Sequence, residues 1–215
     1  MCGRYVIYDL EALYLHYDPP AKFDMSPNFN VAPSQSMPIV TQNGIEIMRW
    51  GLIPRWAKDE KIGYRLINAR SESVFDKPIW KSAALNRRCL VPANGFYEWQ
   101  RRQKGKQPFY IHPKDQSLFM FAGIWETWQH EDRELHTYSI LTTTPNKEMT
   151  AVHNRMPVIL HKEDQAQWLA ADTKEDLEPL LMPYADHMLE MFEVSKSVNV
   201  VKFNDNRLIM PINSH

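Results

Sequence analysis

Cysteine stands at position 2, directly after the initiator methionine, in the opening stretch MCGRY. Met1 is usually removed in cells when the next residue is small, and cysteine is small. Its removal leaves Cys2 with a free α-amine and a thiol on adjacent carbons, which are two nucleophiles in one residue. The alternative is that Cys2 is an inert residue in a frayed terminus. Cys2 is therefore a candidate nucleophile whose role depends on the rest of the chain.

Three further stretches place polar side chains among apolar ones. They are LINARSE (66–72) with Asn68 and Arg70, PANGFYEW (92–99) with Glu98, and AVHNRMPVIL (151–160) with His153. A buried carboxylate between aromatic residues has a raised pKa, which suits proton transfer near neutral pH. A histidine can orient or protonate a developing oxyanion in the same pH range. These residue types fit acid–base chemistry around a nucleophile.

Each of these side chains also has a purely structural interpretation. Glu98 can face solvent from a strand whose neighbouring aromatic residues point inward. His153 can be a histidine bonded to a nearby backbone carbonyl, while Asn68 and Arg70 can be a turn amide and a surface cation. Taken singly, none of the four identifies a site.

The composition of the 215 residues is that of an ordinary globular protein, with 44% hydrophobic and 24% charged residues. We expect one domain over residues 1–215, no membrane span, a cytoplasmic location and a monomer. Two cysteines, Cys2 and Cys89, do not make a disulfide framework, and Cys89 in CLVPA is typical of a buried apolar thiol. The 8 histidines show no paired-ligand spacing and there is no CxxC, so we expect neither a metal nor another cofactor.

Charge is distributed unevenly along the chain. Residues 1–110 carry 16 Lys and Arg against 10 Asp and Glu, an excess of +6, whereas residues 111–215 carry 9 against 16, an excess of −7. A basic first half can supply a phosphate-binding face although the net charge is only −1. The alternative is that the two halves of the sequence are not two halves of the surface.

The pattern of elements favours an α+β domain built on a curved, mostly antiparallel, barrel-like sheet with short peripheral helices. Residues 37–50 predict a hairpin turning at Asn43-Gly44, the pair that suits a type I′ turn. From Arg87 onward the chain reads as an antiparallel meander. Its predicted strands are 87–93, 95–100, 107–113, 117–128 and 135–144, followed by strands at 156–160 and 187–195, with helical segments at 9–17, 146–153, 162–171 and 174–181.

Several motifs in order resemble the SRAP family, the SOS-response-associated peptidases that process abasic sites and form DNA–protein crosslinks. The motifs are MCGRY, NVAP (30–33), RWGLIPRW (49–56), INAR (67–70), RRCLVPANGFYEW (87–99), VHNRMP (152–157) and EVSKSVNVVKFND (193–205). The resemblance extends from residue 1 to about residue 211.

The resemblance implies that Cys2, after loss of Met1, captures an abasic site in single-stranded DNA as a thiazolidine crosslink. It assigns Asn68 to positioning the Cys2 terminus, Glu98 to handling protons, and His153 to the hydroxyl of the opened sugar. Weak lyase activity on abasic DNA is implied by the Schiff-base intermediate, and removal of Met1 is the only peptidase activity that we expect.

The resemblance also implies residues that bind DNA. Arg4 and Arg70 match positions that contact phosphates, and Pro33 and Trp56 match a wedge against the bases beside the lesion. Some family members follow this tryptophan with a second one, whereas this chain has Ala57. The wedge is then smaller, and Arg55 and Lys58 are hypothetical substitutes that contact phosphates.

Two other functions stay open on the sequence alone. An N-terminal-nucleophile thiol hydrolase would use Cys2 with its own amine as base and would act on amides. A non-enzymatic single-stranded DNA-binding module would need Arg4, Trp56 and Arg70 but not Cys2. Only the crosslinking function predicts a covalent adduct with abasic DNA that depends on Cys2.

Overall fold

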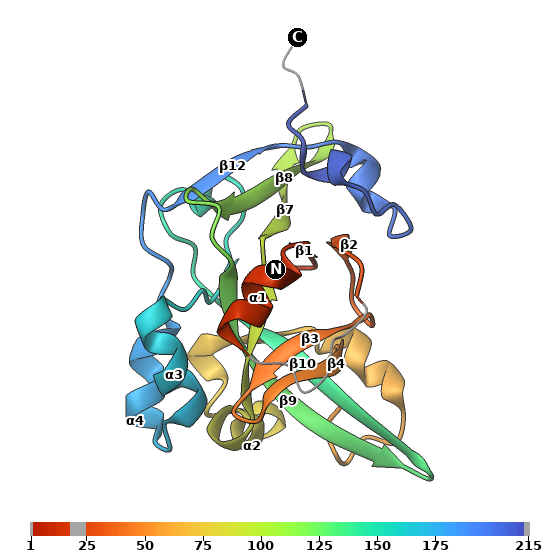
Figure 1. Ribbon diagram of the computed structural model, residues 1–215, viewed down its shortest axis with the longest axis vertical. Helices are drawn as coiled ribbons and strands as arrows, with labels where there is room; N and C mark the ends of the chain where they lie inside the picture. The colour runs from red at the N-terminus through yellow and green to blue at the C-terminus, as the bar shows by residue number, and fades with distance from the viewer. Residues whose placement is uncertain (1, 18–24, 213–215) are drawn as a thin grey trace.

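β-Strands form two sheets with short helices around them in residues 2–17 and 25–212, which the computed structural model describes (Figure 1). Met1, whose removal the sequence predicts, lies outside these residues. The strands are β1 Arg4–Ile7, β2 Asn28–Val31, β3 Ser36–Thr41, β4 Gly44–Trp50, β5 Asn68–Arg70, β6 Arg88–Ala93, β7 Gly95–Arg102, β8 Gly105–Pro113, β9 Phe119–His130, β10 Arg133–Thr143, β11 Met156–Pro157 and β12 Leu189–Glu193. The helices are α1 Leu10–His16, α2 Pro78–Asn86, α3 Lys162–Ala170 and α4 Lys174–Leu177, with 3-10 turns η1 Glu60–Arg65, η2 Ser71–Ser73, η3 Met149–Ala151, η4 Glu178–Leu181, η5 Lys196–Asn199 and η6 Asn206–Ile209.

One sheet closes into a five-stranded barrel in the order β10-β4-β3-β6-β9, because β9 also pairs with β10. All its pairings are antiparallel except that between β4 and β10, which is parallel. The barrel brings β6 and β9 very close at Gly123, where a Cβ atom would lie 2.8 Å from the Cys89 sulfur and 3.0 Å from Val91. The prediction of an α+β fold on a curved, barrel-like sheet is confirmed.

The second sheet is antiparallel throughout, in the order β12-β8-β7-β1-β2, and lies above the barrel in Figure 1. The predicted meander from Arg87 onward is therefore wrong in its connectivity. The chain leaves the barrel after β6, builds the β7–β8 hairpin in the second sheet, and returns as the β9–β10 hairpin. Sequence patterns locate strands, but they do not say which distant strand pairs with which.

The hairpin of β3 and β4 forms as predicted, with a different turn. Thr41 pairs with Gly44, so the two-residue loop is Gln42-Asn43, and of these four residues only Gly44 has a positive φ, of 108°. A type I′ turn needs positive φ at both loop residues and is therefore absent here. The glycine instead provides the left-handed conformation at the first position of β4.

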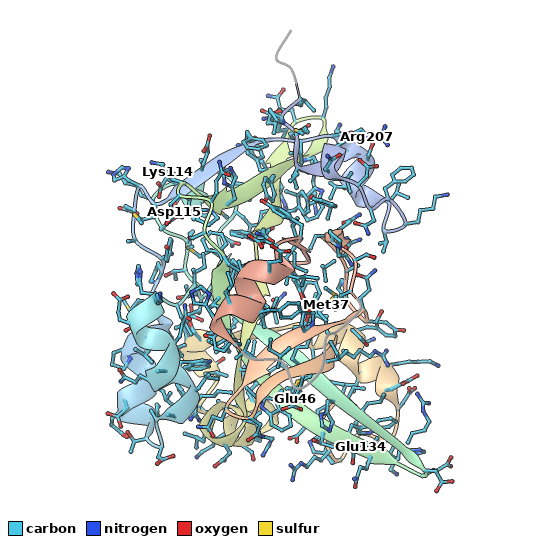
Figure 2. The ribbon with its side chains drawn as sticks, viewed as in Figure 1. Met37, Glu46, Lys114, Asp115, Glu134 and Arg207 are labelled. Atoms are coloured by element: carbon cyan, nitrogen blue, oxygen red, sulfur yellow. The ribbon has the colours of Figure 1, made fainter. Side chains whose placement is uncertain are left out.

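A continuous apolar core joins the sheet to the barrel. It contains Tyr5 from β1, Trp50 from β4 and Tyr138 from β10; the hydroxyls of Tyr5 and Tyr138 lie 2.8 Å apart. Met37 lies inside the molecule, whereas Glu134 lies at its edge near the end of the β9–β10 hairpin (Figure 2). Cys89 is fully buried, as the sequence predicts.

The predicted helices at 9–17 and 162–171 are found as α1 and α3, with small shifts at their ends. Asp9 caps α1 by accepting from the Ala12 N–H at 3.0 Å, and α3 docks on the barrel through Trp168, whose indole donates to the Cys89 carbonyl at 3.0 Å. The segments at 146–153 and 174–181 contain η3 and the α4–η4 pair. No helix in the described residues is long and apolar enough to span a membrane.

Candidate active site

Cys2 is completely buried at the junction of the two sheets, among the residues of the apolar core. Cys2 lies just before β1, and its thiol lies 3.7 Å from the Arg4 carbonyl. Burial, and next the carboxylate of Glu98, raises the pKa of the Cys2 thiol well above its ordinary value. The sulfur is therefore held as a neutral thiol at neutral pH. This order contradicts the interpretation of Cys2 as part of a frayed terminus.

Asn68 fixes the backbone of Cys2. Its side-chain amide donates to the Cys2 carbonyl at 2.8 Å, while its Oδ1 is buried and has no hydrogen-bond partner among the described residues. Asn68 is held by β5, which pairs with β10 in parallel, with Asn68 opposite Ile140. Arg70 is two residues along the same strand and therefore on the same face, and it is exposed.

Glu98 is only 2% exposed, so the interpretation that it faces solvent is wrong. It follows Tyr97, which lies opposite Arg4 in the pairing of β1 with β7, and this register brings Glu98 next to the start of the chain. Tyr97 on the opposite face of β7 is also fully buried. Both faces of the strand are covered here, which is why simple alternation misassigns the direction of Glu98.

His153 follows η3 and reaches Glu98, with 3.9 Å between its Nε2 and a carboxylate oxygen. Its other ring nitrogen accepts from the backbone N–H of Arg155 at 3.1 Å. The same nitrogen also lies 3.3 Å from the Arg155 carbonyl, so both of its contacts are with the backbone of one residue, while Nε2 lies on the side of Glu98. His153 thus has a backbone contact, as a structural histidine does, and also faces a buried carboxylate.

A pocket of about 170 Å³ opens at this pair. It is lined by Glu98, Trp99 and His153 together with two cations, Arg101 and Lys106. Sequence patterns do not single out Arg101 and Lys106, which lie in the polar stretch RRQKGK between two predicted strands. The signal that points to them is the excess of positive charge in the first half of the chain.

The structure therefore places together the buried Cys2 thiol, the Asn68 amide that hydrogen-bonds the Cys2 backbone, and the carboxylate–imidazole pair at a small pocket. This set can accept and donate protons beside the first residues of the chain. Within residues 2–17 and 25–212, no three His, Cys, Asp or Glu side chains gather in the manner of a metal site.

Comparison with known proteins agrees with these features. The family model described as SOS response associated peptidase (SRAP) matches residues 1–201. This chain belongs to the SRAP family. The abasic site processing protein YoaM of Bacillus subtilis is 41% identical over 97% of both chains. The abasic site processing protein YMR114C of Saccharomyces cerevisiae is 31% identical over 86% of this chain and 53% of its own length.

A solved structure shows the same fold. A crystal structure of a protein from Bacteroides thetaiotaomicron superposes with a TM-score of 0.91, at 26% identity, and covers 99% of this chain and 100% of that one. The resemblance stated from the motifs is therefore confirmed, as is the link of this family to abasic sites in DNA damage. The roles of individual residues are a separate question, which their positions address.

Among the residues that the SRAP resemblance assigns to DNA, Arg4 is the nearest to Cys2. It is half-buried, and its guanidinium donates to the Gly3 carbonyl at 2.9 Å. Burial lowers the pKa of Arg4 from its ordinary value. Its Nε is buried without a hydrogen-bond partner among the described residues. Arg4 therefore has one hydrogen-bond donor that the described residues do not satisfy.

The two wedge residues of the SRAP resemblance lie on separate loops. Pro33 is half-buried in the turn between β2 and β3, next to Ser34, whose φ is 72°. Trp56 is 67% exposed in the loop between β4 and η1. Ala57, the residue after this tryptophan, is buried, and its carbonyl accepts from the Trp128 indole at 2.7 Å. Of Pro33 and Trp56, only Trp56 therefore presents an exposed aromatic face.

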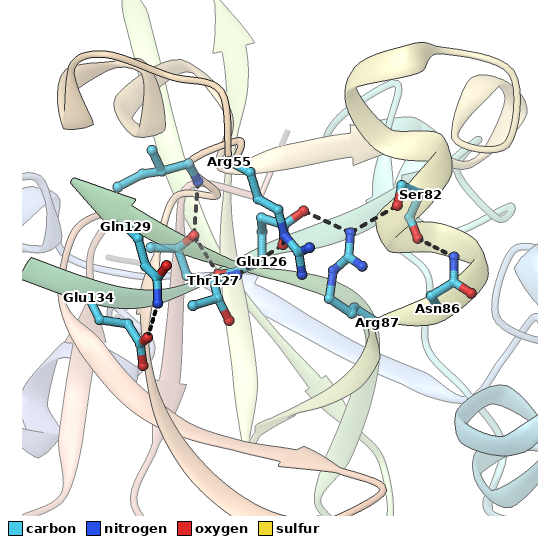
Figure 3. Close-up of polar contacts among 10 residues, drawn as sticks. Arg55, Ser82, Asn86, Arg87, Glu126, Thr127, Gln129 and Glu134 are labelled. Atoms are coloured by element: carbon cyan, nitrogen blue, oxygen red, sulfur yellow. Dashed lines mark hydrogen bonds and ion pairs between the residues drawn. The ribbon is translucent and has the colours of Figure 1, made fainter.

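Arg55 and Lys58 flank that tryptophan and differ in availability. Arg55 donates to Glu126 at 2.7 Å, and Arg87 donates to the other oxygen of the same carboxylate at 2.7 Å (Figure 3). The hypothesis that Arg55 contacts phosphates therefore requires this ion pair to open, whereas Lys58 is exposed.

Proposed function

We propose that this chain captures abasic sites in single-stranded DNA as a covalent thiazolidine adduct at Cys2. The observation that supports the proposal best is the placement of a buried Cys2, fixed by Asn68, beside the Glu98–His153 pair. The curated relatives named abasic site processing proteins support the target. The proposal requires removal of Met1, by the chain itself or by an aminopeptidase, so that Cys2 carries the α-amine.

The first step is attack of this amine on the aldehyde at C1′ of the opened abasic sugar. An α-amine with a pKa of about 7.7–8.0 is partly unprotonated at neutral pH, so it is a competent nucleophile. The C–N bond forms and water leaves, which gives a Schiff base. Asn68 positions the amine: its Nδ2 holds the Cys2 carbonyl, and its unpartnered Oδ1 accepts from the amine.

The second step is addition of the thiol to the imine carbon. The S–C bond forms, the imine nitrogen gains the proton that sulfur loses, and the five-membered ring closes. The raised pKa of the Cys2 thiol keeps sulfur neutral until the electrophilic imine lies next to it. Burial thus favours an amine-first order.

Glu98 and His153 carry protons through these steps. Glu98 accepts a proton from the attacking amine and returns one to the departing water, and it reverses these transfers when the crosslink opens. His153 places its Nε2 beside Glu98, and from there it donates to the hydroxyl of the opened sugar. The Schiff base also permits loss of the 3′ phosphate after removal of a C2′ proton, which gives weak lyase activity.

Binding of the strand is assigned to side chains around this centre. Arg4 and Arg70 contact the phosphates flanking the lesion, and Trp56 with Pro33 forms the wedge against neighbouring bases. Phosphate contacts give salt-dependent affinity, and stacking on an aromatic face tolerates any base. Because Ala57 is buried, Trp56 is the residue of this loop that supplies the aromatic face of the wedge.

The amide-hydrolase alternative fits less well. A cysteine that attacks amides acts as a thiolate and needs a lowered pKa. Burial shifts the pKa of the Cys2 thiol in the opposite direction.

Intact-mass spectrometry before and after incubation with a single-stranded oligonucleotide bearing one abasic site tests the proposal. We expect loss of Met1 and a stable one-to-one adduct that disappears in Cys2→Ala. The matched control is Cys89→Ala, which removes the other buried thiol and retains the adduct.

Three results contradict the proposal. Retention of Met1 means that the amine and thiol are never available together. Loss of Met1 without an adduct favours the hydrolase. Equal affinity for intact and abasic strands, with no adduct, favours a simple DNA-binding module.

A further inference from the structure

The β7–β8 hairpin places two cations at the rim of the pocket that Glu98 and His153 line. Arg101 and Lys106 are cross-strand partners in this hairpin, both are exposed, and both line the pocket of about 170 Å³. No ion pair joins either of them to an acidic side chain in the described part of the chain. Neither cation of this rim therefore has a carboxylate within ion-pair distance among the described residues, although Glu98 lines the same pocket.

The arrangement is unfavourable for the hairpin by itself. Like charges directly opposite each other on adjacent strands destabilise a sheet. The next residue, Arg102, shows the usual solution, because its guanidinium is paired with Glu193 of β12 and also donates to the Gln100 side chain at 2.8 Å. One hairpin thus contains an arginine with an ion-pair partner and, among the described residues, two cations without one. These two cations are the ones that line the pocket.

Accepting the proposed function, we infer that Arg101 and Lys106 together bind one backbone phosphate of the DNA strand next to the abasic sugar. An anion between them removes their mutual repulsion and receives charge-assisted hydrogen bonds from both. The phosphate is thereby placed at the mouth of the pocket that contains Glu98 and His153. Arg101 and Lys106 are positioning residues for the strand, separate from Arg4 and Arg70 on β1 and β5.

The test measures binding of a strand that contains a tetrahydrofuran analogue of the abasic site. This analogue has no aldehyde and cannot crosslink, so its affinity is independent of the covalent chemistry. We expect Arg101→Ala/Lys106→Ala to bind it about 10-fold more weakly. The slope of log affinity against log salt should become shallower by about 0.7, the loss of one phosphate contact on a single strand.

The matched control is Arg102→Ala/Lys104→Ala, which removes two positive charges from the same hairpin but none that lines the pocket. Its affinity and salt slope stay close to those of the unmodified chain. An equal loss in both double variants overturns the inference, because it assigns the effect to overall charge. Arg101→Gln/Lys106→Gln retains more of the side-chain stems, and thermal melting of all variants checks that the hairpin is folded.

Neutral methylphosphonate linkages locate the phosphate. If a single neutral linkage beside the lesion removes the difference between the unmodified chain and Arg101→Ala/Lys106→Ala, the inference is supported. If the difference persists with each flanking linkage neutralised in turn, it is overturned. Failure of the proposed function is a separate result, since it appears as the absence of any adduct between the unmodified chain and a true abasic strand.

Discussion

Glu98 and Glu126 are both buried carboxylates on long strands, and their surroundings are opposite. Glu126 on β9 accepts from Arg55 and Arg87 at 2.7 Å each and from the Thr127 backbone N–H at 3.0 Å (Figure 3). Glu98 on β7 faces His153 at 3.9 Å and borders a pocket. A guanidinium stays charged at every physiological pH, whereas an imidazole gains or loses its proton near neutrality. One buried carboxylate thus faces two guanidinium groups, and the other faces an imidazole at the edge of a pocket.

The partners of the two buried carboxylates differ, and so do the roles that they permit. Two permanent cations compensate the charge of Glu126, so this site joins β9 to the β4–η1 loop and to the residue before β6. Glu98 is instead buried beside the Cys2 thiol and the imidazole of His153, at the edge of a pocket. Burial alone therefore does not identify a reactive carboxylate; the nature of its partners does.

Replacing Glu98 should have the largest effect on chemistry. We expect Glu98→Gln to slow adduct formation by about 10²- to 10⁴-fold, because the amide keeps the shape but cannot accept a proton. Single-turnover time courses at saturating abasic DNA measure the rate, and the tetrahydrofuran strand measures binding, which should be unchanged. A rate near that of the unmodified chain would place Glu98 with Glu126 as a structural residue.

Replacing Glu126 should have the converse effect. We expect Glu126→Gln to lower the free energy of unfolding by about 3 kcal/mol, since Arg87 is left as a largely buried cation without its anion. Arg55 is mostly exposed and can turn to water, which keeps the loss at the low end. Urea denaturation measures it, with exposed Glu134→Gln as control. Slower crosslinking by the folded variant would contradict the assigned role.

Changing the partner of Glu98 should have a smaller effect. We expect His153→Gln to slow adduct formation by about 10-fold through loss of one hydrogen bond to the sugar. Single-turnover time courses measure the rate. The control is His161→Gln, which removes a histidine stacked on Tyr184 at 4.9 Å. A rate equal to that of the unmodified chain would show that His153 serves only the backbone of Arg155.

The sequence identifies the chemistry of the site better than its surroundings. Cys2, Asn68, Glu98 and His153 carry distinctive motifs, and the structure brings all four together. Their meeting depends on the pairing of β1 with β7 and of β5 with β10, which are separated by about 90 and 70 residues in the chain. Such pairings are set by the whole core, so no local pattern predicts them.

The proposed phosphate-binding residues also could not be found from local sequence patterns. Arg101 and Lys106 look like ordinary polar residues next to a turn, and their significance appears only when the register places them opposite each other. The parallel pairing of β4 with β10 and the split of the expected meander between two sheets are hidden for the same reason. Residue type indicates what a side chain can do, and tertiary pairing decides where it acts.

Glu72 is a third carboxylate, and it has an arginine partner, but unlike Glu98 and Glu126 it is partly exposed. Its replacement should have the smallest effect of those considered. Its side chain is about half exposed, and it binds the guanidinium of largely buried Arg155 through both oxygens, one at 2.9 Å. Hydrogen bonds from Arg155 hold the pKa of Glu72 below its ordinary value. A lowered pKa in the folded state contributes stability above the unfolded pKa of about 4.3, and that stability is lost as pH falls through the folded pKa.

We therefore expect Glu72→Gln to lower the free energy of unfolding at pH 7 by no more than about 1 kcal/mol, because solvent screens this exposed carboxylate. The difference between the variant and the unmodified chain should begin to shrink as pH falls below about 4.3 and should vanish only below the lowered pKa of folded Glu72, where the unmodified chain has lost the same interaction. Urea denaturation at several pH values measures both, with exposed Glu131→Gln as control. A difference that persists unchanged at low pH would mean that Glu72 stabilises Arg155 through neutral hydrogen bonds. The interaction would then differ in kind from the ion pairs of Glu126.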